Sequence, residues 1–533
     1  MIDSFEELSA ILQSRFENDA IKKLNQIESP SAFKGMREAT ERIALALEEG
    51  EAIEIVGDYD ADGVIASVIL SDFFDCAKAK FPKTKYGVYL PDRFKEGYGV
   101  SPQIIDRIKA NLIVTVDNGI NAIETAKRAK ELGKTLIITD HHICPETPPQ
   151  AYAIINPRQP DCPSKYKELC GASIAWYFAA SLTRTLGVEF DLNEALAFVA
   201  LASIADCVAL NGANRALTKT GIKRLNLCRR PYAIALKSIC QAPIDSEQIA
   251  FKIAPKINAA GRIEHSRLAY DFLRSETIEE AFKRLAKLDD LAKRRKIIEE
   301  AIIGEALTQC TEKESAIVVS ANGWNEGAIG IAAARLAERF YKPAIAIAIN
   351  GQNAKASARS YGEIDILSLI ASCEKYVKSF GGHKKAAGIN LAADRIDEFK
   401  KAFYAAASRI KLPDFVENRA VLGELNPLLI ARKLCEIIDR FEPFGEGNPR
   451  PIFIAKNMLV KDCKKMGQDG AHLRLILSCD RVDNLEAILF FADRLLGDRK
   501  LNIGDRVSFH YAVFLDSFNG VSRLRLRVEK INA

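Results

Sequence analysis

The first 230 residues alternate short β-branched runs with segments of helical periodicity, and this alternation limits the fold more than any other feature of the sequence. The runs are apolar throughout, which is typical of strands buried on both faces. Such strands, separated by helices, predict a doubly wound parallel sheet in an α/β lobe. The predicted strands are 51–57, 86–90, 111–116, 134–139 and 151–156, with a helix over 121–133 and a mainly helical part over 169–230.

The rest of the chain predicts three further parts. From Glu276 to about Lys313, apolar residues recur at helical spacing without proline, which indicates a long helix connecting two lobes. A second, smaller α/β lobe follows, with strands at 316–321 and 344–349 and a helix at 363–377. From about Phe415, a helix and then short strands separated by glycines indicate a small β-barrel. The barrel strands are expected at 472–479, 485–491, 506–515 and 522–531, and the four units at 1–230, 231–313, 314–412 and 413–533.

Composition and cysteine usage point to a globular chain in a reducing compartment. The chain is 48% hydrophobic and 27% charged, and its twelve cysteines form no CxxC pair, so we expect reduced thiols rather than a zinc ribbon or a disulfide framework. The opening MIDSFEELSA is not a secretory signal, and the longest uncharged stretch (169–183) is too short to span a membrane. We therefore expect a cytoplasmic protein with no membrane partner.

Residues of metal-ligand type follow the ends of several predicted elements. Asp58, Asp60 and Asp62 follow the first strand, Asp117 follows the third, Asp140-His141-His142 follows the fourth, and Asp206 ends an apolar helix. Because the carboxyl ends of parallel strands share one edge of the sheet, these side chains are expected to meet there.

That many carboxylates cannot all stay ionised in one pocket without cations. Oxygen ligands with one or two imidazoles suit Mn²⁺ or Mg²⁺ better than a thiolate-preferring metal. Two such ions form the usual clamp for attack of water on a phosphate ester. The residues therefore predict a two-metal phosphoesterase.

A calcium-binding loop, a nucleotide-binding loop and simple helix caps fit these residues less well. The Asp58–Gly63 run resembles the start of an EF-hand loop, but Ile69 stands where that loop needs a glutamate. The sequence holds no P-loop motif, and the glycine-rich GWNEGAIG (323–330) lacks dinucleotide-binding spacing. Acidic turns that cap helices would account for one cluster alone, but not for four at one edge.

The acidic clusters with Asp140-His141-His142 resemble the DHH phosphoesterase superfamily. Further blocks are similar to motifs of its bacterial single-strand-specific exonucleases and stand in the order found there: PDRFKEGYG (91–99), APKINAAGRIEH (254–265), SARS (357–360), GGHKKAAG (381–388) and FEPFGEGNPRP (441–451). The resemblance covers residues 57–451. It implies a DHH catalytic lobe, a DHH-associated second lobe and an OB-fold-like third domain.

The resemblance implies 5′-to-3′ hydrolysis of single-stranded DNA to mononucleotides in DNA repair and recombination, with two Mn²⁺ or Mg²⁺ ions. It implies ligands Asp58, Asp60 and Asp117 for one ion and Asp62, Asp117, His141 and Asp206 for the other. His142 is expected beside the scissile phosphate, with Asp140 orienting a histidine. Related enzymes often carry a histidine where Val56 stands here, so Asp58 is expected to replace that ligand.

A second set of residues is expected to bind DNA. By resemblance, Arg93 and Arg262 belong to motifs associated with the 5′-terminal phosphate. Ser357 and Arg359 offer a hydroxyl and a guanidinium to a phosphate, and a turn at Gly381-Gly382 would let the backbone and His383 approach a nucleotide. In the barrel, basic residues interleave with aromatic ones, a mixture used by single-strand-binding OB-folds. The candidate contacts there are Arg474, Arg523 and Arg525.

The formal net charge of only +5 is consistent with this expectation, since an acidic pocket floor and a basic channel would offset each other. Single-stranded DNA is the expected partner of a monomer, with single-strand-binding protein and other repair proteins expected from the resemblance. Two alternatives stay open. One is a DHH-family enzyme acting on oligoribonucleotides or cyclic dinucleotides, and the other is a catalytically inactive replication scaffold.

Overall fold

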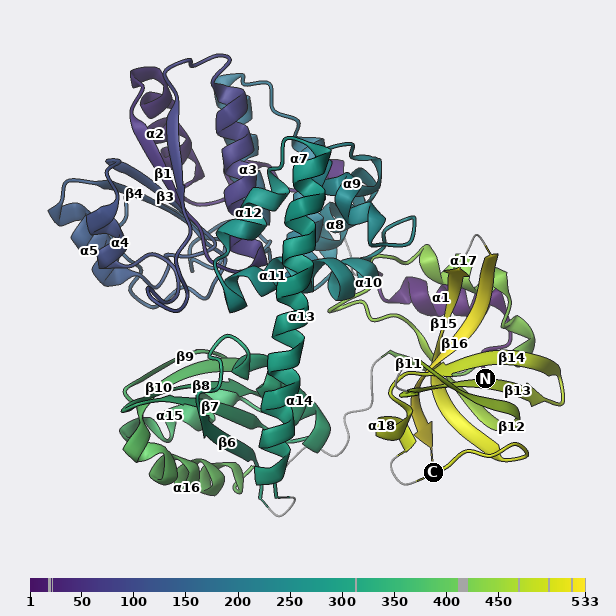
Figure 1. The fold of residues 1–533 in the computed structure, drawn as a ribbon. Coiled ribbons are helices and arrows are strands. Elements are labelled where there is room, and N and C mark those ends of the chain that lie inside the picture. Colours follow the sequence, from purple (N-terminus) through teal and green to yellow (C-terminus); the bar gives the residue numbers. More distant parts are fainter. Residues whose placement is uncertain are drawn as a thin grey trace.

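Two α/β lobes joined by one long helix, α13, and a β-barrel beside them make up the molecule (Figure 1). The computed structural model describes residues 1–17, 21, 23–311, 314–410, 420–467, 470–496, 499–518 and 521–532. The predicted start of the third domain near Phe415, the predicted boundary at 412 and 413, and the end of the predicted long helix at Lys313 lie outside these residues.

The first sheet is parallel throughout, as predicted. Its order is β2-β1-β3-β4-β5, so the chain leaves β1 on one side and returns to β3 on the other. This reversal is the place where open parallel sheets bind ligands. The strands are β1 (Ala52–Val56), β2 (Lys85–Tyr89), β3 (Leu112–Val116), β4 (Thr135–Thr139) and β5 (Ala153–Ile155).

Helices cover both faces of this sheet. One face packs against α2, α3 and α6, and the other packs against α4 and α5. Neighbouring residues such as Leu112 and Ile113 therefore enter different cores, which explains the continuous apolar strands. The helices up to the second lobe are α1 (Phe5–Ser14), α2 (Met36–Glu49), α3 (Ala61–Ala77), α4 (Pro102–Arg107), α5 (Ile123–Glu131), α6 (Gly171–Leu186), α7 (Leu192–Ala205), α8 (Gly212–Leu227), α9 (Pro231–Ser238), α10 (Ser246–Gln248), α11 (Ala254–Ile263), α12 (Arg267–Leu273) and α13 (Ile278–Gln309).

The predicted connector helix is present and spans both lobes. Its 32 residues extend about 48 Å at 1.5 Å per residue. Leu285, Leu288 and Leu291 enter the core of the first lobe, whereas Ile302 and Ala306 pack against the second. One continuous helix therefore fixes the separation of the two lobes.

The second lobe holds a mixed sheet in the order β6-β7-β8-β10-β9. The helix predicted over 363–377 is wrong in length: α15 covers only Ile366–Ala371, and the Ser372 hydroxyl donates to the Leu369 carbonyl (2.6 Å) at its end. The elements are β6 (Ile317–Asn322), α14 (Ile329–Phe340), β7 (Ala344–Asn350), β8 (Asn353–Arg359), α15 (Ile366–Ala371), β9 (Ser379–His383), β10 (Ala386–Ala392) and α16 (Ile396–Ala407).

The third domain is a closed barrel, as predicted. Strands β12, β13, β14, β16 and β15 pair in turn, and the β12–β15 pairing closes the ring. The helix α1 from the start of the chain contributes Leu8 and Leu12 to the barrel core. The elements are β11 (Val421–Glu424), α17 (Arg432–Asp439), β12 (Ile452–Met466), β13 (His472–Cys479), β14 (Val482–Leu489), α18 (Ala492–Leu496), β15 (Arg506–Phe518) and β16 (Val521–Asn532).

Candidate metal centre and nucleic-acid interface

Two aspartates lie at the switch point of the first sheet. Asp58 and Asp117 follow the paired strands β1 and β3, and both are buried. Asp117 has a left-handed backbone (φ 63°), and its N–H donates to the Thr139 carbonyl (2.9 Å). A Cβ on Gly171 would lie 2.5 Å from an Asp117 carboxylate oxygen, so glycine is needed there for the two segments to approach.

Helix α3 begins inside the same site. Asp60 caps the helix, and its carboxylate accepts from the N–H groups of Asp62 (3.0 Å) and Gly63 (3.1 Å). The Asp62 carboxylate is held in turn by the first turn of α6, where Gly171 N–H and Ala172 N–H donate at 2.6 and 2.7 Å. Each of these carboxylates keeps lone pairs that no backbone donor uses.

The Asp140-His141-His142 triplet follows β4, and its three side chains have different contacts. His141 Nε2 lies 3.1 Å from Asp117 Oδ1 and 3.8 Å from carboxylate oxygens of Asp62 and Asp206. Buried Asp140 instead accepts from His141 N–H (2.7 Å), His142 N–H (3.1 Å) and the His142 ring (2.8 Å). Asp140 therefore orients His142, while His141 faces the other carboxylates.

The structure brings the predicted ligands into two adjoining groups. Ligand atoms of Asp58, Asp60 and Asp117 lie within 4.8 Å of one another, and so do those of Asp62, His141 and Asp206. The short contact between Asp117 and His141 links the groups. The family resemblance implies these ligand sets with Asp117 in both, and Asp117 lies in a further group with His141 and His142.

The electrostatics of this cluster call for cations. Burial, followed by the charges of neighbouring aspartates, raises the pKa of Asp58, Asp117 and Asp206 well above the usual range and that of Asp62 to about 6. Burial lowers the pKa of His141 to about 3, so its imidazole is neutral. Within the described chain, buried Asp58 Oδ1 and Asp117 Oδ1 have no hydrogen-bond partner. Neutral imidazole and unpartnered carboxylate oxygens fit Mn²⁺ or Mg²⁺.

His142 has the opposite electrostatic character. Burial opposes its charged form, but the hydrogen bond and charge of Asp140 outweigh burial and raise the pKa of His142 to about 9. The Tyr98 hydroxyl lies 3.3 Å from the same ring. At neutral pH the imidazolium therefore stands beside the acidic cluster as a hydrogen-bond donor.

Three arginines gather beside this site. Burial and the charge of Arg93 lower the pKa of Arg262 to about 10 and also lower the pKa of Arg359. Arg262 donates to the Gly327 carbonyl (3.2 Å), and Arg359 donates to the Ser357 hydroxyl (2.9 Å). Among the described residues, none of the three arginines forms an ion pair with a carboxylate. The cluster therefore offers an anion guanidinium groups that no direct ion pair occupies.

The Gly381-Gly382-His383 segment differs from its prediction. The sequence suggested a turn, but Gly381, Gly382 and His383 lie in strand β9, and the turn follows at 384–385. A Cβ on Gly382 would lie 2.3 Å from the Ala386 carbonyl, so close hairpin pairing requires this glycine. His383 is solvent-accessible, and partial desolvation by its surroundings, together with the charges of His142 and Arg359, lowers its pKa. The second lobe thus presents this strand toward the catalytic lobe.

The predicted barrel contacts are not equally available. Arg474 and Arg525 both pair with Glu486, at 2.9 and 3.0 Å, so the two share one carboxylate. Arg523 is exposed. The aromatic residues Phe509 and Tyr511 are buried in the barrel core and cannot stack on bases.

Three residues that the sequence did not single out also shape the site. Tyr59 stacks under Arg93, whose guanidinium lies 4.9 Å from the ring centroid. Asn258 accepts from Ala61 N–H (2.9 Å) at the start of α3. Tyr98 and Asn258 lie within two of the family-like motifs, and this position in the sequence could have identified them as site residues.

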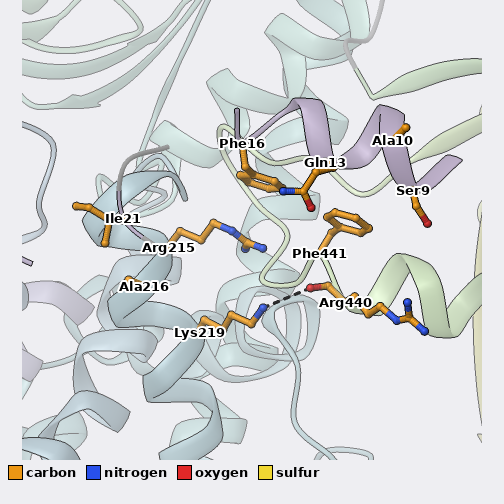
Figure 2. Close-up of a pocket in the computed structure, with 10 residues that line it drawn as sticks. All are labelled: Ser9, Ala10, Gln13, Phe16, Ile21, Arg215, Ala216, Lys219, Arg440 and Phe441. Atoms are coloured by element: carbon orange, nitrogen blue, oxygen red, sulfur yellow. Dashed lines mark hydrogen bonds between the residues drawn. The ribbon is translucent and has the colours of Figure 1, made fainter. Parts of the chain in front are cut away.

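A separate cavity of about 560 Å³ lies away from these residues (Figure 2). It is lined by α1, α8 and the residues after α17, and contains none of the predicted site residues.

Among the described residues, the structure has no helix with the length and hydrophobicity that a membrane span needs.

Three family models match the chain in succession. The DHH family N-terminal domain matches residues 52–210, the DHHA1 domain matches residues 313–409, and the RecJ OB domain matches residues 423–530. They correspond to the first lobe, the second lobe and the barrel.

Curated relatives and solved structures agree with this succession. The single-stranded-DNA-specific exonuclease RecJ of Escherichia coli is 30% identical over 98% of this chain and 96% of its own length. The Bacillus subtilis RecJ is 32% identical over 94% of this chain, which spans 64% of that relative. The crystal structure of Thermus thermophilus RecJ in complex with Mn²⁺ superposes with a TM-score of 0.82 at 27% identity, covering 98% of this chain and 76% of that one.

Proposed function

Because this chain belongs to the RecJ family of single-stranded-DNA-specific exonucleases, we propose that it is a metal-dependent exonuclease that hydrolyses single-stranded DNA from the 5′ end and releases mononucleotides. The observation that carries the proposal is the pair of ligand groups beside three arginines that form no direct ion pair among the described residues. The ligand groups suit divalent cations, and the arginines suit a terminal phosphate.

The ligand groups would hold two Mn²⁺ or Mg²⁺ ions, with Asp117 shared. The first group is Asp58, Asp60 and Asp117, and the second is Asp62, Asp117, His141 and Asp206. When bound, the ions would supply positive charge to the phosphodiester and lower the pKa of an attacking water. The crystal structures of the Thermus relative were obtained with Mn²⁺ and with Mg²⁺.

His142 and the arginines would position the substrate. Asp140 keeps His142 protonated, so the ring can donate a hydrogen bond to the scissile phosphate. Arg93, Arg262 and Arg359, with Ser357, would bind the 5′-terminal phosphate by charge-assisted hydrogen bonds. Gly261, which precedes Arg262, packs closely on the Tyr59 carbonyl, where a Cβ would lie 2.2 Å away, so the terminal phosphate would sit beside the metal groups.

The second lobe and the barrel would guide the strand. Strand β9 would present Gly381, Gly382 and His383 to the nucleotide being cut. In the barrel we propose Arg523 as the most available contact, since Arg474 and Arg525 share Glu486. We propose functional units at 1–230, 231–313, 314–412 and 413–533, with α1 packed on the last of these.

The family resemblance also supports proposals about context. These are a role in DNA repair and recombination, a monomeric cytoplasmic enzyme, and contacts with single-strand-binding protein. A native mass measurement and a pull-down with that protein test them.

Digestion of single strands labelled at either end tests the proposed function. With Mn²⁺ or Mg²⁺, a 5′ label should appear in mononucleotides at once, while a 3′ label should remain on shortening strands. Release of the 3′ label first, or equal activity in Asp117→Ala, would refute the proposal. Oligoribonucleotides and cyclic dinucleotides in the same assay test the alternative substrates, and inactivity toward every substrate would favour a scaffold.

A further inference from the structure

The FEPFGEGNPRP block, residues 441–451, lies in the third domain yet takes no part in the proposed chemistry. Its fold is fixed from within by Asn448, which is fully buried. The Asn448 side-chain amide donates to the carbonyls of Phe441 (2.9 Å) and Pro443 (2.8 Å). The backbones of Gly445 and Asn448 also exchange two hydrogen bonds, at 3.0 and 3.2 Å. Segment 441–451 is therefore a closed loop with its own internal support.

Helices of the first lobe hold this loop from the outside. On α8, Arg215 donates to the Glu442 carbonyl (2.9 Å). Lys219 donates to the Arg440 carbonyl (3.3 Å), the hydrogen bond that Figure 2 draws. On α10, the Ser246 hydroxyl accepts from Phe444 N–H (2.9 Å).

An ion-pair network adds to this support. Arg450 lies 2.9 Å from Glu247 of α10 and 3.0 Å from Glu442 within the loop. Arg15, which follows α1, donates to the Pro449 carbonyl (2.6 Å). The loop is thus anchored to three helices and cannot shift without breaking several contacts.

The tip of the loop rests on the residues that follow Asp206. The Glu446 carbonyl accepts from Leu210 N–H (2.7 Å). A Cβ on Gly445 would lie 2.8 Å from Leu210 Cδ1, and a Cβ on Gly447 would lie 3.3 Å from Ala209 Cβ. Glycine at both positions lets the two backbones meet closely.

Asp206 needs such external support. It caps the C-terminus of α7, and Cys207 after it has a left-handed backbone (φ 56°). Its side chain is 27% exposed, whereas those of Asp62 and Asp117 are 1% and 2% exposed. No hydrogen bond in the described chain reaches its carboxylate. The direction of that carboxylate is therefore set by the backbone of residues 206–210.

We propose that segment 441–451 is a positioning element that fixes Asp206 as a metal ligand through Gly445 and the Glu446–Leu210 hydrogen bond. The proposal rests on the proposed function, because it takes Asp206 to be a ligand. It places residues of the third domain in support of the catalytic site itself. Glu446 also lies 3.9 Å from Lys385, in the turn after β9, so the loop adjoins both lobes at this site.

Mn²⁺ binding to the full chain, followed by electron paramagnetic resonance and calorimetry, tests the proposal together with kcat and KM on an oligonucleotide. Gly445→Ala should weaken one Mn²⁺ site and lower kcat, each about tenfold, with KM for DNA little changed. Leu210→Val removes the atom that the new methyl would meet, so Gly445→Ala/Leu210→Val should recover most of the loss. Gly304→Ala, on an exposed part of α13 with open space around it, is the matched control and should bind Mn²⁺ normally.

Two further arms keep the result decisive. Should Gly445→Ala not fold, Arg215→Met removes one anchor of the loop and should weaken Mn²⁺ binding, whereas Lys223→Met on the same helix should not. Asp206→Asn separates the inference from its premise. Loss of a site in Asp206→Asn with normal binding in Gly445→Ala overturns the inference, as does a Gly445→Ala effect confined to KM. Normal binding in Asp206→Asn overturns the ligand assignment and the inference with it.

Discussion

Replacing Asp117 by asparagine should stabilise the metal-free protein while removing the effect of metal on stability. Oxygen atoms of Asp58, Asp60 and Asp117 lie within 4.8 Å of one another in a largely buried site. At an effective dielectric constant of about 20, two full charges at that separation repel by about 3.5 kcal/mol. Because the raised pKa values of Asp58 and Asp117 let these two carboxyl groups hold protons, we expect a net gain of about 2 kcal/mol from removing one charge.

A gain of that size should raise the unfolding midpoint of the catalytic lobe by about 4–8 °C in EDTA. The wild-type protein should instead gain about 2.7 kcal/mol for each ion supplied at 100 times its dissociation constant. Asp117→Asn lacks the shared ligand, so Mn²⁺ should leave its midpoint nearly unchanged. Thermal unfolding in EDTA and in Mn²⁺ measures both effects.

Asp140 provides the matched control, since it is equally buried but fully hydrogen-bonded. Hydrogen bonds to His142 and to backbone N–H groups lower its pKa against the opposing effect of burial. Asp140→Asn should therefore destabilise the protein by about 3 kcal/mol, with or without metal. If both variants shift the midpoint in EDTA in the same direction, or if Asp117→Asn keeps the full response to Mn²⁺, the reasoning from charge repulsion is refuted.

Three further predictions concern the packing of the metal site, the phosphate site and the half-buried Glu442. Gly171→Ala would place a methyl 2.5 Å from an Asp117 oxygen, so Mn²⁺ affinity measured by calorimetry should fall about 10- to 100-fold, and unchanged affinity would contradict the importance of this close packing. Arg359→Met should remove the preference for a 5′-phosphorylated over a 5′-hydroxyl oligonucleotide, at a cost of at least about tenfold in kcat/KM on the former, and a retained preference would contradict the assigned phosphate site. Burial, opposed by Arg450, raises the pKa of Glu442 from 4.5 to about 7, so the folded protein binds a proton that the unfolded chain releases. Its free energy of unfolding should therefore fall as pH rises from about 4.5 to 7. Measured by urea unfolding at several pH values, that fall should be smaller in Glu442→Gln, and an equal fall in both proteins would contradict the assignment.

The metal centre was predictable because its geometry follows from topology. Once β1 and β3 are recognised as parallel strands, Asp58 and Asp117 must lie at the same edge. The division of ligands between two ions came from the family resemblance and stays a prediction, although the ligand atoms do lie in adjoining groups. The role of Asp140 was foreseeable in kind, but only the structure shows that His142 is the histidine it orients.

Several features depended on pairings that local patterns do not encode. Strands β8, β9 and β10 are rich in Ala, Gly and Ser, so they lack the β-branched pattern that marked the first lobe. Nothing in the sequence indicates that Arg474 and Arg525 are already paired. Their partner Glu486 is brought next to them by the strand pairing of the barrel. The contact between residues 445–447 and 209–210 joins positions far apart in sequence, so a local sequence pattern cannot predict it.

Anomalous scattering from crystals grown with Mn²⁺ and a 5′-phosphorylated oligonucleotide tests the two-metal site most directly. We predict two manganese peaks, both contacting Asp117, one also among Asp58 and Asp60 and the other among Asp62, His141 and Asp206. We also predict that the terminal phosphate lies on Arg93, Arg262 and Arg359. A single peak, or peaks away from these carboxylates, would contradict the two-metal site. A 3′ end at the arginine cluster would contradict the assigned phosphate site.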